Sequence, residues 1–292
     1  MGIFSFLKKK EVELAILDCI EIETDIHAHW LPGIDDGAKN VEDSIEIISY
    51  LTSLGFKNLV ATPHVMSDFY NNSTDTILQK LQLVKDAVAK TNIDVQLFAA
   101  AEYNLDEEFV KRIAEKDLLT LPNTNIVLFE LSYINPPNNL KVVVKDLFVK
   151  GYQPLLAHPE RYPFYAADLS TYEELKDMGV QFQINLMSLA GHYGPQAKFI
   201  AKYLMDKNWV DFVGTDIHKK AHSTSIEKAL QTEEVNAIGT ANAEIARVLL
   251  ATNDAVGQGE RARWRVEGEG REEQAHGAGC RCCVAAWHAI SD

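Results

Sequence analysis

Short apolar runs alternate with longer stretches in which apolar residues recur every three or four positions, from residue 23 to about residue 230. The short runs are typical of strands with both faces buried, and the longer stretches are typical of helices with one buried face. Regular alternation of the two predicts parallel βαβ units and an α/β fold. Seven such repeats favour a closed or nearly closed barrel over an open doubly wound sheet.

The predicted strands are short, mainly apolar segments, and they cover residues 23–26, 58–64, 94–102, 125–131, 152–161, 180–186 and 209–218. The predicted helices lie between them and cover residues 40–54, 75–90, 106–116, 139–150, 170–178 and 195–205. Ser73 or Thr74 is a candidate N-cap for the second helix, and Ser170 is one for the fifth. Glycines follow three of the helices, at Gly55, Gly151 and Gly179.

Composition limits the class of protein. The chain has 292 residues, ordinary apolar content and a formal net charge of −14, which argues against nucleic-acid binding because such proteins usually carry a basic face. No apolar run approaches the length of a membrane span, so we expect no stable membrane insertion. Cys19 is the sole cysteine before residue 280, which indicates a reducing environment and predicts a cytoplasmic protein.

The pattern divides the chain into three parts. Residues 1–22 form a predicted N-terminal arm, residues 23–251 the barrel, and residues 252–292 a tail rich in Gly, Arg and Glu. The tail has no sustained periodicity, so we expect it to be disordered or foreign to the domain. Its Cys-Arg-Cys-Cys segment, residues 280–283, does not fit the spacing of a standard zinc finger.

Side chains that can bind metals recur at one position in the repeats, namely the C-terminal ends of predicted strands. In (β/α) barrels the loops that follow the strands converge at this end and carry the active site. Chance would scatter such residues over helices and strand starts as well. The residues in question are His27, His29, His64, Glu102, Glu130, His158, Asp216 and His218.

Two pairs within this set have metal-ligand spacing. His27 and His29 are two residues apart at a strand end, so both imidazoles face the same way, and Asp216 and His218 repeat the arrangement. Imidazole with carboxylate suits Zn, Mn or Fe. The alternative is that these are hydrogen-bonded structural residues.

Glu102 and Glu130 each end an almost wholly apolar strand, where an unpaired carboxylate would be costly to bury. A metal ion would remove that cost, and the alternative is an ion pair with an arginine or lysine. In the motif that follows the first strand, either Asp35 or Asp36 is a candidate ligand.

Several loop residues near the same end are weaker candidates. Asn185 is either a substrate contact or a strand-end cap. The others could bind an anionic substrate or simply be solvated: His192, Lys219, Lys220 and His222.

Five motifs together resemble the polymerase and histidinol phosphatase (PHP) superfamily: HxH at His27 and His29, TPH ending at His64, the strand-end Glu102, HPER at 158–161 and TDIH at 215–218. Within it, the HxHxLPGIDDGA, ATPH and AHPERY variants resemble bacterial manganese-dependent protein-tyrosine phosphatases encoded in capsule and exopolysaccharide loci. The resemblance runs from about residue 24 to about residue 250.

The resemblance implies a distorted (β/α)7 TIM-like barrel of the PHP type with three divalent metal ions, manganese first and iron or zinc as alternatives. It implies three ligand sets, which are His27, His29, Glu102 and Asp216 for one ion, Glu102, Glu130 and His158 for a second, and Asp36, His64 and His218 for the third. Asp36 is favoured over Asp35 on this ground. Arg161 matches the family arginine that contacts the substrate phosphate.

The implied activity is hydrolysis of phosphotyrosine by a metal-activated hydroxide, with a tyrosine kinase that regulates capsule or exopolysaccharide synthesis as the expected protein substrate. The Cys-x5-Arg loop of thiol-based tyrosine phosphatases is absent. Alternatives are a phosphatase of the histidinol-phosphate type, a phosphodiesterase of the same fold, or a non-catalytic metal-bound regulator.

Overall fold

The computed structural model describes residues 22–232. The predictions for the arm, for the tail with its cysteines and for the end of the barrel region lie outside these residues. Within the described part, no helix combines the length and apolar character that a membrane crossing requires.

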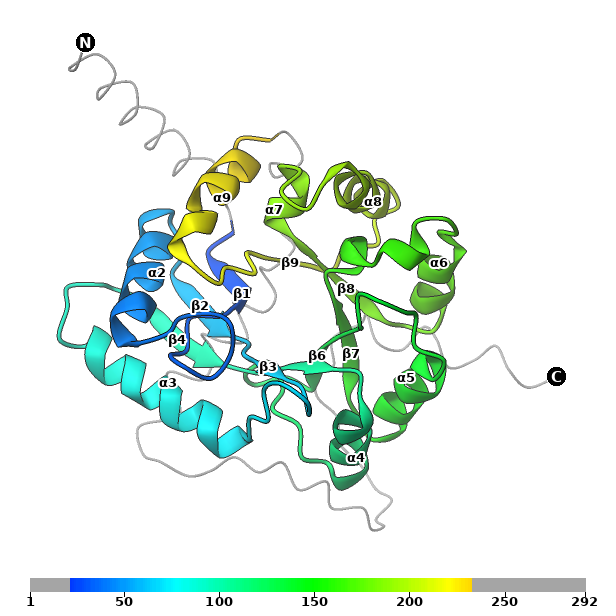
Figure 1. Cartoon of the computed structure of the whole chain (residues 1–292), viewed down its shortest axis with the longest axis horizontal. Coiled ribbons are helices and arrows are strands. Elements are labelled where there is room, and N and C mark those ends of the chain that lie inside the picture. The colour runs from blue at the N-terminus through cyan, green and yellow to red at the C-terminus, as the bar shows by residue number, and fades with distance from the viewer. Residues whose placement is uncertain (1–21, 233–292) are drawn as a thin grey trace, which may run out of the picture. The chain divides into compact units, whose positions relative to one another are not determined.

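Nine strands and eight α-helices make up the described part (Figure 1). The strands are β1 Thr24–Ala28, β2 Asn58–Ala61, β3 His64–Val65, β4 Gln96–Ala99, β5 Glu102–Asn104, β6 Ile126–Glu130, β7 Gln153–Ala157, β8 Gln181–Asn185 and β9 Phe212–Gly214. The α-helices are α2 Val41–Ser53, α3 Thr74–Val88, α4 Glu107–Glu115, α5 Leu140–Val149, α6 Ser170–Asp177, α7 Leu186–Leu189, α8 Pro195–Asp206 and α9 Ser223–Leu230. Three 3-10 turns complete the set: η1 Pro159–Arg161, η2 Pro163–Tyr165 and η3 Lys220–His222.

The prediction that residues 58–64 and 94–102 form single strands is wrong. Each segment breaks into two short strands, so that β1-β2-β4 form one parallel sheet and β3-β5-β6-β7-β8-β9 form another. Pro63 lies at the first break, and proline cannot donate a hydrogen bond to a sheet. The backbone pairing nevertheless continues across both breaks without a change of register, because Ala61 pairs with Ala99 and His64 with Glu102.

The two sheets therefore follow one path around a ring, in which β2 with β3 and β4 with β5 each fill one position. Nine strands thus occupy seven positions. The ring closes between its first and last strands, where the N–H of Asp216 donates to the carbonyl of His27 at 2.8 Å and that of His29 to Ile217 at 2.9 Å. Figure 1 shows the helices arranged around this ring, and the mixed α/β fold with parallel strands is compatible with the predicted distorted (β/α)7 barrel.

Apolar side chains fill the barrel in two clusters. A large cluster packs the outer faces of the strands against the helices, with Ile47 and Leu51 of α2 among its fully buried members. A smaller cluster joins side chains from strands all around the ring, including Ile26, Leu128 and Leu155, and so lies inside it. This inner apolar cluster lies inside the barrel, beneath the strand ends.

Polar caps fix where three helices begin. Asn40, Ser73 and Asp106 each accept a hydrogen bond from a backbone N–H of the first turn. Ser73 is therefore the cap of α3, as one of the two candidates predicted. The expected cap at Ser170 is wrong, because Ser170 is already helical and Leu169 occupies the capping position.

Candidate metal centre

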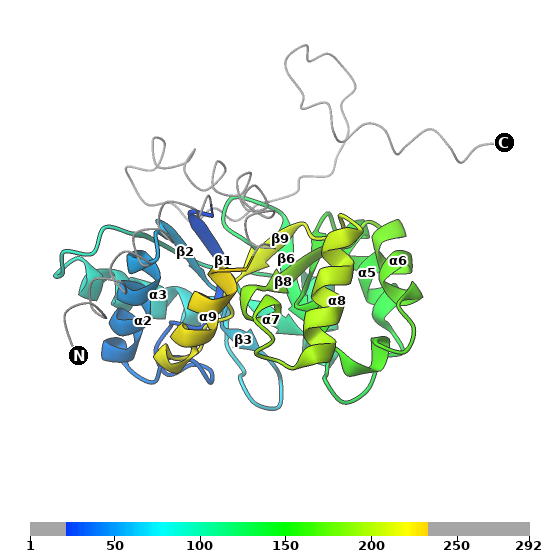
Figure 2. The same cartoon turned by 90° about the horizontal axis from the view of Figure 1, so that it is seen from above.

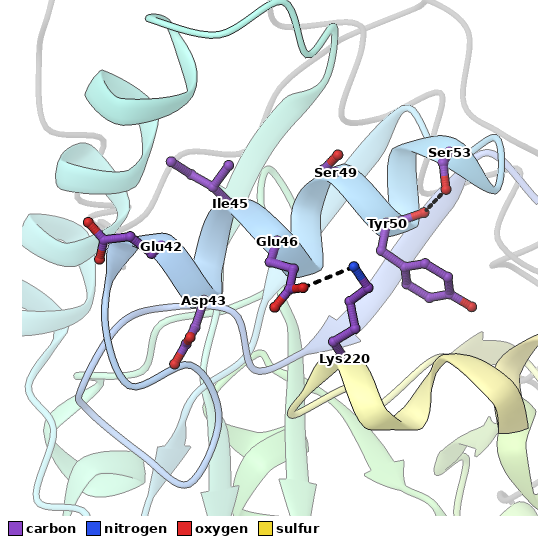
Figure 3. Close-up of a pocket in the computed structure, with 8 residues that line it drawn as sticks. All are labelled: Glu42, Asp43, Ile45, Glu46, Ser49, Tyr50, Ser53 and Lys220. Atoms are coloured by element: carbon purple, nitrogen blue, oxygen red, sulfur yellow. Dashed lines mark hydrogen bonds and ion pairs between the residues drawn. The ribbon is translucent and has the colours of Figure 1, made fainter.

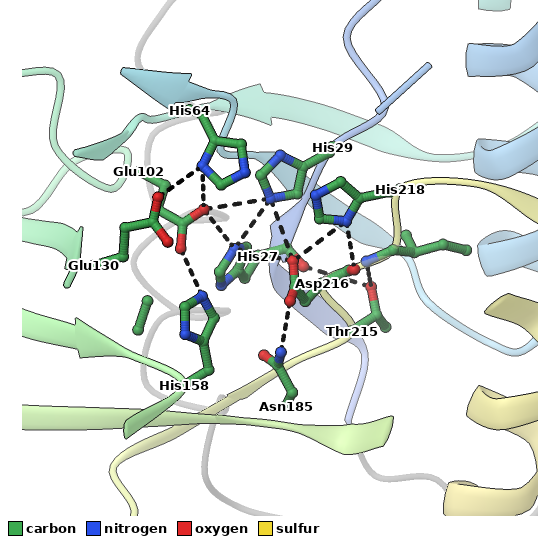
Figure 4. Close-up of polar contacts among 12 residues, drawn as sticks. His27, His29, His64, Glu102, Glu130, His158, Asn185, Thr215, Asp216 and His218 are labelled. Carbon is green, nitrogen blue, oxygen red and sulfur yellow. Dashed lines mark hydrogen bonds and ion pairs between the residues drawn. The ribbon is translucent and has the colours of Figure 1, made fainter. Parts of the chain in front are cut away.

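Nine side chains from the strand ends and the loops after them converge at one end of the barrel. They are His27, His29, Asp36, His64, Glu102, Glu130, His158, Asp216 and His218, and Figure 4 shows all of them except Asp36. Their imidazole nitrogens and carboxylate oxygens approach closely enough to form four overlapping groups. The groups are His29, Asp36, His64 and His218; His27, His29 and Asp216; His27, Glu102 and His158; and His64, Glu102 and Glu130.

These groups share most of their members with the three ligand sets that the family resemblance implies. One difference concerns Glu130 and His158, which the resemblance assigns to the same ion but which fall in separate groups here. Glu102 belongs to two groups, with its Oε1 2.9 Å from His158 Nε2 and its Oε2 3.1 Å from His64 Nδ1, so it is a residue that could contribute to more than one ion. The groups differ in further ways: His29 also joins the group around Asp36, and Glu102 is grouped with His27 and with His64 but not with the pair His29 and Asp216.

The expected orientation of His27 and His29 is confirmed. Their Nε2 atoms lie 3.2 Å apart, and both face the same oxygen atoms on two carboxylates. Glu102 Oε2 lies 3.3 Å from His27 Nε2 and 3.5 Å from His29 Nε2. Asp216 Oδ1 lies 3.5 Å and 3.4 Å from the same two nitrogens. The two imidazole nitrogens therefore each face both carboxylates, and His27, His29 and Asp216 together form one of the four groups.

Three buried atoms of the cluster have no hydrogen-bond partner: His64 Nδ1, Glu102 Oε2 and Glu130 Oε1. His64 Nδ1 lies 3.1 Å from each of the two oxygens. Unsatisfied buried carboxylate oxygens are costly, and a divalent cation would satisfy them. The ion pairs found for Glu102 and Glu130 within residues 22–232 join them to histidines, not to lysine or arginine. The residues present therefore fit a metal ion.

Electrostatic interactions with the histidines lower the pKa values of three carboxyls in the cluster, Asp36, Glu102 and Asp216. Burial alone would raise the pKa of Glu102, but the charge on His27 and its neighbours holds that pKa well below its usual range. Burial alone would lower the pKa of His29, but hydrogen bonds to Asp216 and Asp35 outweigh it and raise the pKa to about 10. Metal binding must therefore displace protons from histidine while the carboxylates are already in their ligating form.

Asp35 and Asp36 have different surroundings. Asp35 Oδ2 accepts a hydrogen bond from His29 Nδ1 at 2.8 Å, and its Oδ1 accepts one from the N–H of Gly37 at 2.9 Å. Asp36 Oδ1 instead lies 3.4 Å from His64 Nε2 and 3.3 Å from His218 Nε2. This geometry favours Asp36 as a ligand and Asp35 as the residue that orients His29.

Buried amides behind the cluster fix the orientation of two further members. Gln183 Oε1 lies 2.7 Å from His27 Nδ1, and Asn185 Nδ2 donates to Asp216 Oδ2 at 2.6 Å. Asn185 ends β8 and occupies the capping position before α7, but its side chain makes no cap hydrogen bond and contacts Asp216 instead. Gln183 was not anticipated, although polar residues at every second position of β8, Gln181, Gln183 and Asn185, were a signal of an inward polar face.

The backbone at and beside the cluster has uncommon conformations and one close approach. His158 and Asp216 adopt left-handed conformations, with φ of 34° and 52°. Such conformations are uncommon for residues other than glycine and concentrate at functional sites. Gly214 lies directly against His27, and a Cβ on Gly214 would come within 2.6 Å of the His27 Cβ. This close approach explains why glycine precedes the TDIH motif.

Arg161 lies beside the cluster, at a cavity of about 460 Å³. Its Nη1 donates to Asp216 Oδ2 at 2.8 Å, and its guanidinium carbon lies 4.2 Å from the ring centre of Tyr193 and 4.9 Å from that of Tyr133. Two aromatic faces and a carboxylate thus hold the cation in one place. Sequence reasoning missed both tyrosines, which lie in loops without a distinguishing motif.

Three of the other loop candidates, His192, Lys219 and Lys220, form no hydrogen bond or ion pair with the cluster within residues 22–232, whereas His222 Nδ1 accepts a hydrogen bond from the N–H of His218 at 3.4 Å. His192 Nδ1 lies 2.8 Å from Ser225 Oγ, and Lys219 is exposed. Lys220 forms an ion pair with Glu46 at 2.9 Å in a separate acidic hollow on α2 (Figure 3). Burial and the positive charge on neighbouring residues lower the pKa of His222 to about 4, so this ring is neutral near pH 7.

A parallel barrel with imidazole and carboxylate ligands at its strand ends defines a metal-dependent hydrolase. The chain belongs to the CpsB/CapC capsular polysaccharide synthesis family, whose sequence model matches residues 23–252. It is 31% identical over 211 residues to the tyrosine-protein phosphatase YwqE of Bacillus subtilis, covering 72% of this chain and 83% of YwqE. It is 27% identical over 199 residues to the tyrosine-protein phosphatase CpsB of Streptococcus agalactiae, covering 66% and 82% of the two chains.

A solved structure supports the same relationship. It comes from a study of YwqE from B. subtilis and CpsB from Streptococcus pneumoniae, described there as metal-dependent tyrosine phosphatases. The match has a TM-score of 0.69 and 30% identity, and it covers 76% of this chain and 93% of the other.

Proposed function

We propose that this chain is a metal-dependent protein-tyrosine phosphatase. The observation that carries the proposal is that Arg161, Tyr133 and six of the nine cluster residues line one cavity. A phosphate monoester bound there would have a cation on one side and the cluster on the other. The names of the relatives support tyrosine as the alcohol component of the ester.

We infer three divalent metal ions in the cluster, with manganese as the first choice and iron or zinc as alternatives. In the assignment that the family resemblance implies, the first ion would be held by His27, His29, Glu102 and Asp216, the second by Glu102, Glu130 and His158, and the third by Asp36, His64 and His218. All nine residues belong to the four groups of candidate ligands, although these groups divide them differently. When bound, such ions supply positive charge for phosphoryl oxygens and lower the pKa of water near the phosphorus atom.

The chain's own residues would orient the ester. Arg161 presents a planar donor fork that suits two oxygens of the phosphate, and its fixed position means that little rotational freedom is lost on binding. Asp216 and the rings of Tyr133 and Tyr193 hold the guanidinium in place. Among the described residues, no cysteine lines the cavity, so the chain offers no thiol nucleophile there.

We propose that the physiological substrate is a phosphotyrosine protein of the cytoplasm, and specifically a tyrosine kinase that regulates capsule or exopolysaccharide synthesis. The capsular polysaccharide synthesis family supports this choice.

The test compares hydrolysis of a phosphotyrosine peptide with hydrolysis of histidinol phosphate by the purified chain, after removal of metal and after reconstitution with Mn²⁺. Bound metal is counted by mass spectrometry. We expect metal-dependent hydrolysis of the peptide, and loss of at least a hundredfold in kcat/KM in Arg161→Met, because charge stabilisation of the transition state is lost. Preference for histidinol phosphate would overturn the substrate, and equal activity without metal would overturn the mechanism.

A further inference from the structure

Two large apolar side chains at the cavity are strongly exposed to solvent. Phe69 is 75% exposed and Ile134 is 83% exposed, and both line the cavity that contains Arg161 and the metal-ligand candidates. They come from different loops, one between β3 and α3 and one between β6 and α5. Figure 2 shows the loop after β3 projecting beyond the strand ends. Exposed apolar residues that gather at a cavity are typical of binding surfaces.

A tight turn presents Phe69. Met66 and Tyr70 exchange backbone hydrogen bonds of 3.0 Å and 2.8 Å, which places Phe69 at the end of the turn. The N–H of Ser67 donates to Asp106 Oδ2 at 2.9 Å, and the ring of Tyr70 stacks on the ring of His64. Phe69 is therefore exposed on a turn whose backbone these contacts hold in place.

A second local turn presents Ile134. Its N–H donates to Ser132 Oγ at 3.2 Å, and two prolines, Pro136 and Pro137, follow and restrict the backbone. Tyr133 lies between Ser132 and Ile134 and faces Arg161. Side chains that are held in place before a ligand arrives lose less entropy on binding.

Aspartate and glutamate outnumber lysine and arginine among the residues that line the cavity. Arg161 is the one lysine or arginine among the lining residues, within the part of the chain that the structure describes. Asp68 and Asp106 also line the cavity, outside the cluster. Away from the cluster, the remaining parts of a ligand whose phosphate occupies Arg161 would find carboxylates and apolar groups but no lysine or arginine among the lining residues of the described part.

We propose that Phe69 and Ile134 form a docking rim for a polypeptide, in which apolar residues that flank the phosphotyrosine pack on the two side chains and acidic flanking residues are disfavoured. The inference rests on the proposed function, because it requires the phosphate to bind at Arg161. A small phosphorylated metabolite held at Arg161 would end inside the cavity, whereas a polypeptide continues past its rim. The rim therefore favours a protein substrate over a free metabolite.

The test uses three esters with the Mn²⁺-loaded full chain: p-nitrophenyl phosphate, a phosphotyrosine peptide with Val and Leu at the flanking positions, and the same peptide with Glu at those positions. The variants are Phe69→Ser and Ile134→Ser. The matched control is Phe199→Ser on α8, which is 61% exposed and does not line the cavity. Affinity for a non-hydrolysable phosphonate version of the apolar peptide is measured by titration as a second readout.

We expect the wild-type chain to prefer the apolar peptide over the acidic one by at least tenfold in kcat/KM. Each rim variant should lose about tenfold on the apolar peptide, about 1.4 kcal/mol, mainly through KM, with a smaller loss on p-nitrophenyl phosphate. The phosphonate peptide should weaken in parallel, and Phe199→Ser should match wild type. Asp68→Asn should improve kcat/KM for the acidic peptide, because a repulsive charge is removed.

Equal losses on the peptide and on p-nitrophenyl phosphate, or equal rates on the two peptides, would overturn the docking rim and leave the phosphatase activity standing. Failure to hydrolyse any of the three esters would overturn the proposed function, and the docking rim with it.

Discussion

The cluster has two halves that differ in burial. The buried half consists of residues at most 1% exposed, namely His27, His29, Glu102, His158 and Asp216. The open half faces the cavity and consists of Asp36, His64 and His218, whose side chains are 54%, 14% and 16% exposed. Glu130, at 3% exposure, lies between them.

The halves also differ in what holds their side chains. In the buried half, Gln183 contacts His27, Asn185 and Arg161 contact Asp216, and Asp35 contacts His29. In the open half, the Asp36 Oδ1 has only the two histidines of its own group at ion-pair distance within residues 22–232, whereas His218 Nδ1 lies 2.9 Å from the carbonyl oxygen of Asp216 and the ring of His64 stacks on Tyr70.

We infer that contacts within the barrel hold the side chains of the buried half in position, whereas Asp36 in the open half depends more on a bound ligand for its position. Substitutions in the buried half should therefore affect both stability and chemistry. Substitutions in the open half should change the binding of a metal ion without unfolding the chain.

Asp216→Asn should have the largest effect. Asparagine tolerates the left-handed φ of 52° and keeps the shape, so the change removes mainly the charge that faces His27, His29 and Arg161. We expect kcat for p-nitrophenyl phosphate at saturating Mn²⁺ to fall about a thousandfold. Urea unfolding of the metal-free protein should show a loss of about 3 kcal/mol, because a buried charge loses its partner.

Asp206→Asn, at the exposed end of α8, is the control and should match wild type in both assays. Activity of Asp216→Asn within tenfold of wild type would show that the buried half does not carry the chemistry.

Gln183→Met should have the next largest effect. The side chain is fully buried, and methionine of similar size removes the acceptor that orients His27. Loss of such a contact behind a ligand typically weakens metal affinity or activity 10- to 100-fold. We expect that range in the Mn²⁺ concentration that gives half-maximal activity. Gln181→Met, two residues earlier on the same strand, should leave it unchanged, and equal shifts in the two variants would contradict the role of Gln183.

The buried half was also the easier half to predict from sequence. His27 and Asp216 follow or end apolar runs, and the (β/α) pattern alone places such residues at one end of a barrel. Their supports were not predictable in the same way, because glutamine within a strand is common and carries no metal-ligand signature. Tyr133 and Tyr193 were missed because a loop residue's position depends on tertiary packing.

The strand breaks mark a second limit of the pattern. Pro63 signalled the first break, but the second, near Ala100, has no local signal, since alanine fits a strand interior. It arises because β4 follows the bend of its neighbour β2 with unchanged register. The ion pair between Lys220 and Glu46 at the surface could not be predicted either, because the two residues are distant in sequence.

The smallest change in stability should follow Asp36→Asn in the open half, and its neighbour provides the matched comparison. Asp36 is half-exposed, so we expect the free energy of unfolding of the metal-free protein to change by less than about 1 kcal/mol. Bound metal after dialysis, counted by mass spectrometry, should nevertheless fall, because a ligand is lost. Asp35→Asn should differ in lowering stability, by about 2 kcal/mol, through its hydrogen bonds to His29 and Gly37, and should reduce bound metal less than Asp36→Asn because it removes no ligand. If Asp35→Asn instead removed the metal without a loss of stability, the ligand would be Asp35, and the division between the two halves would have to be redrawn through this motif.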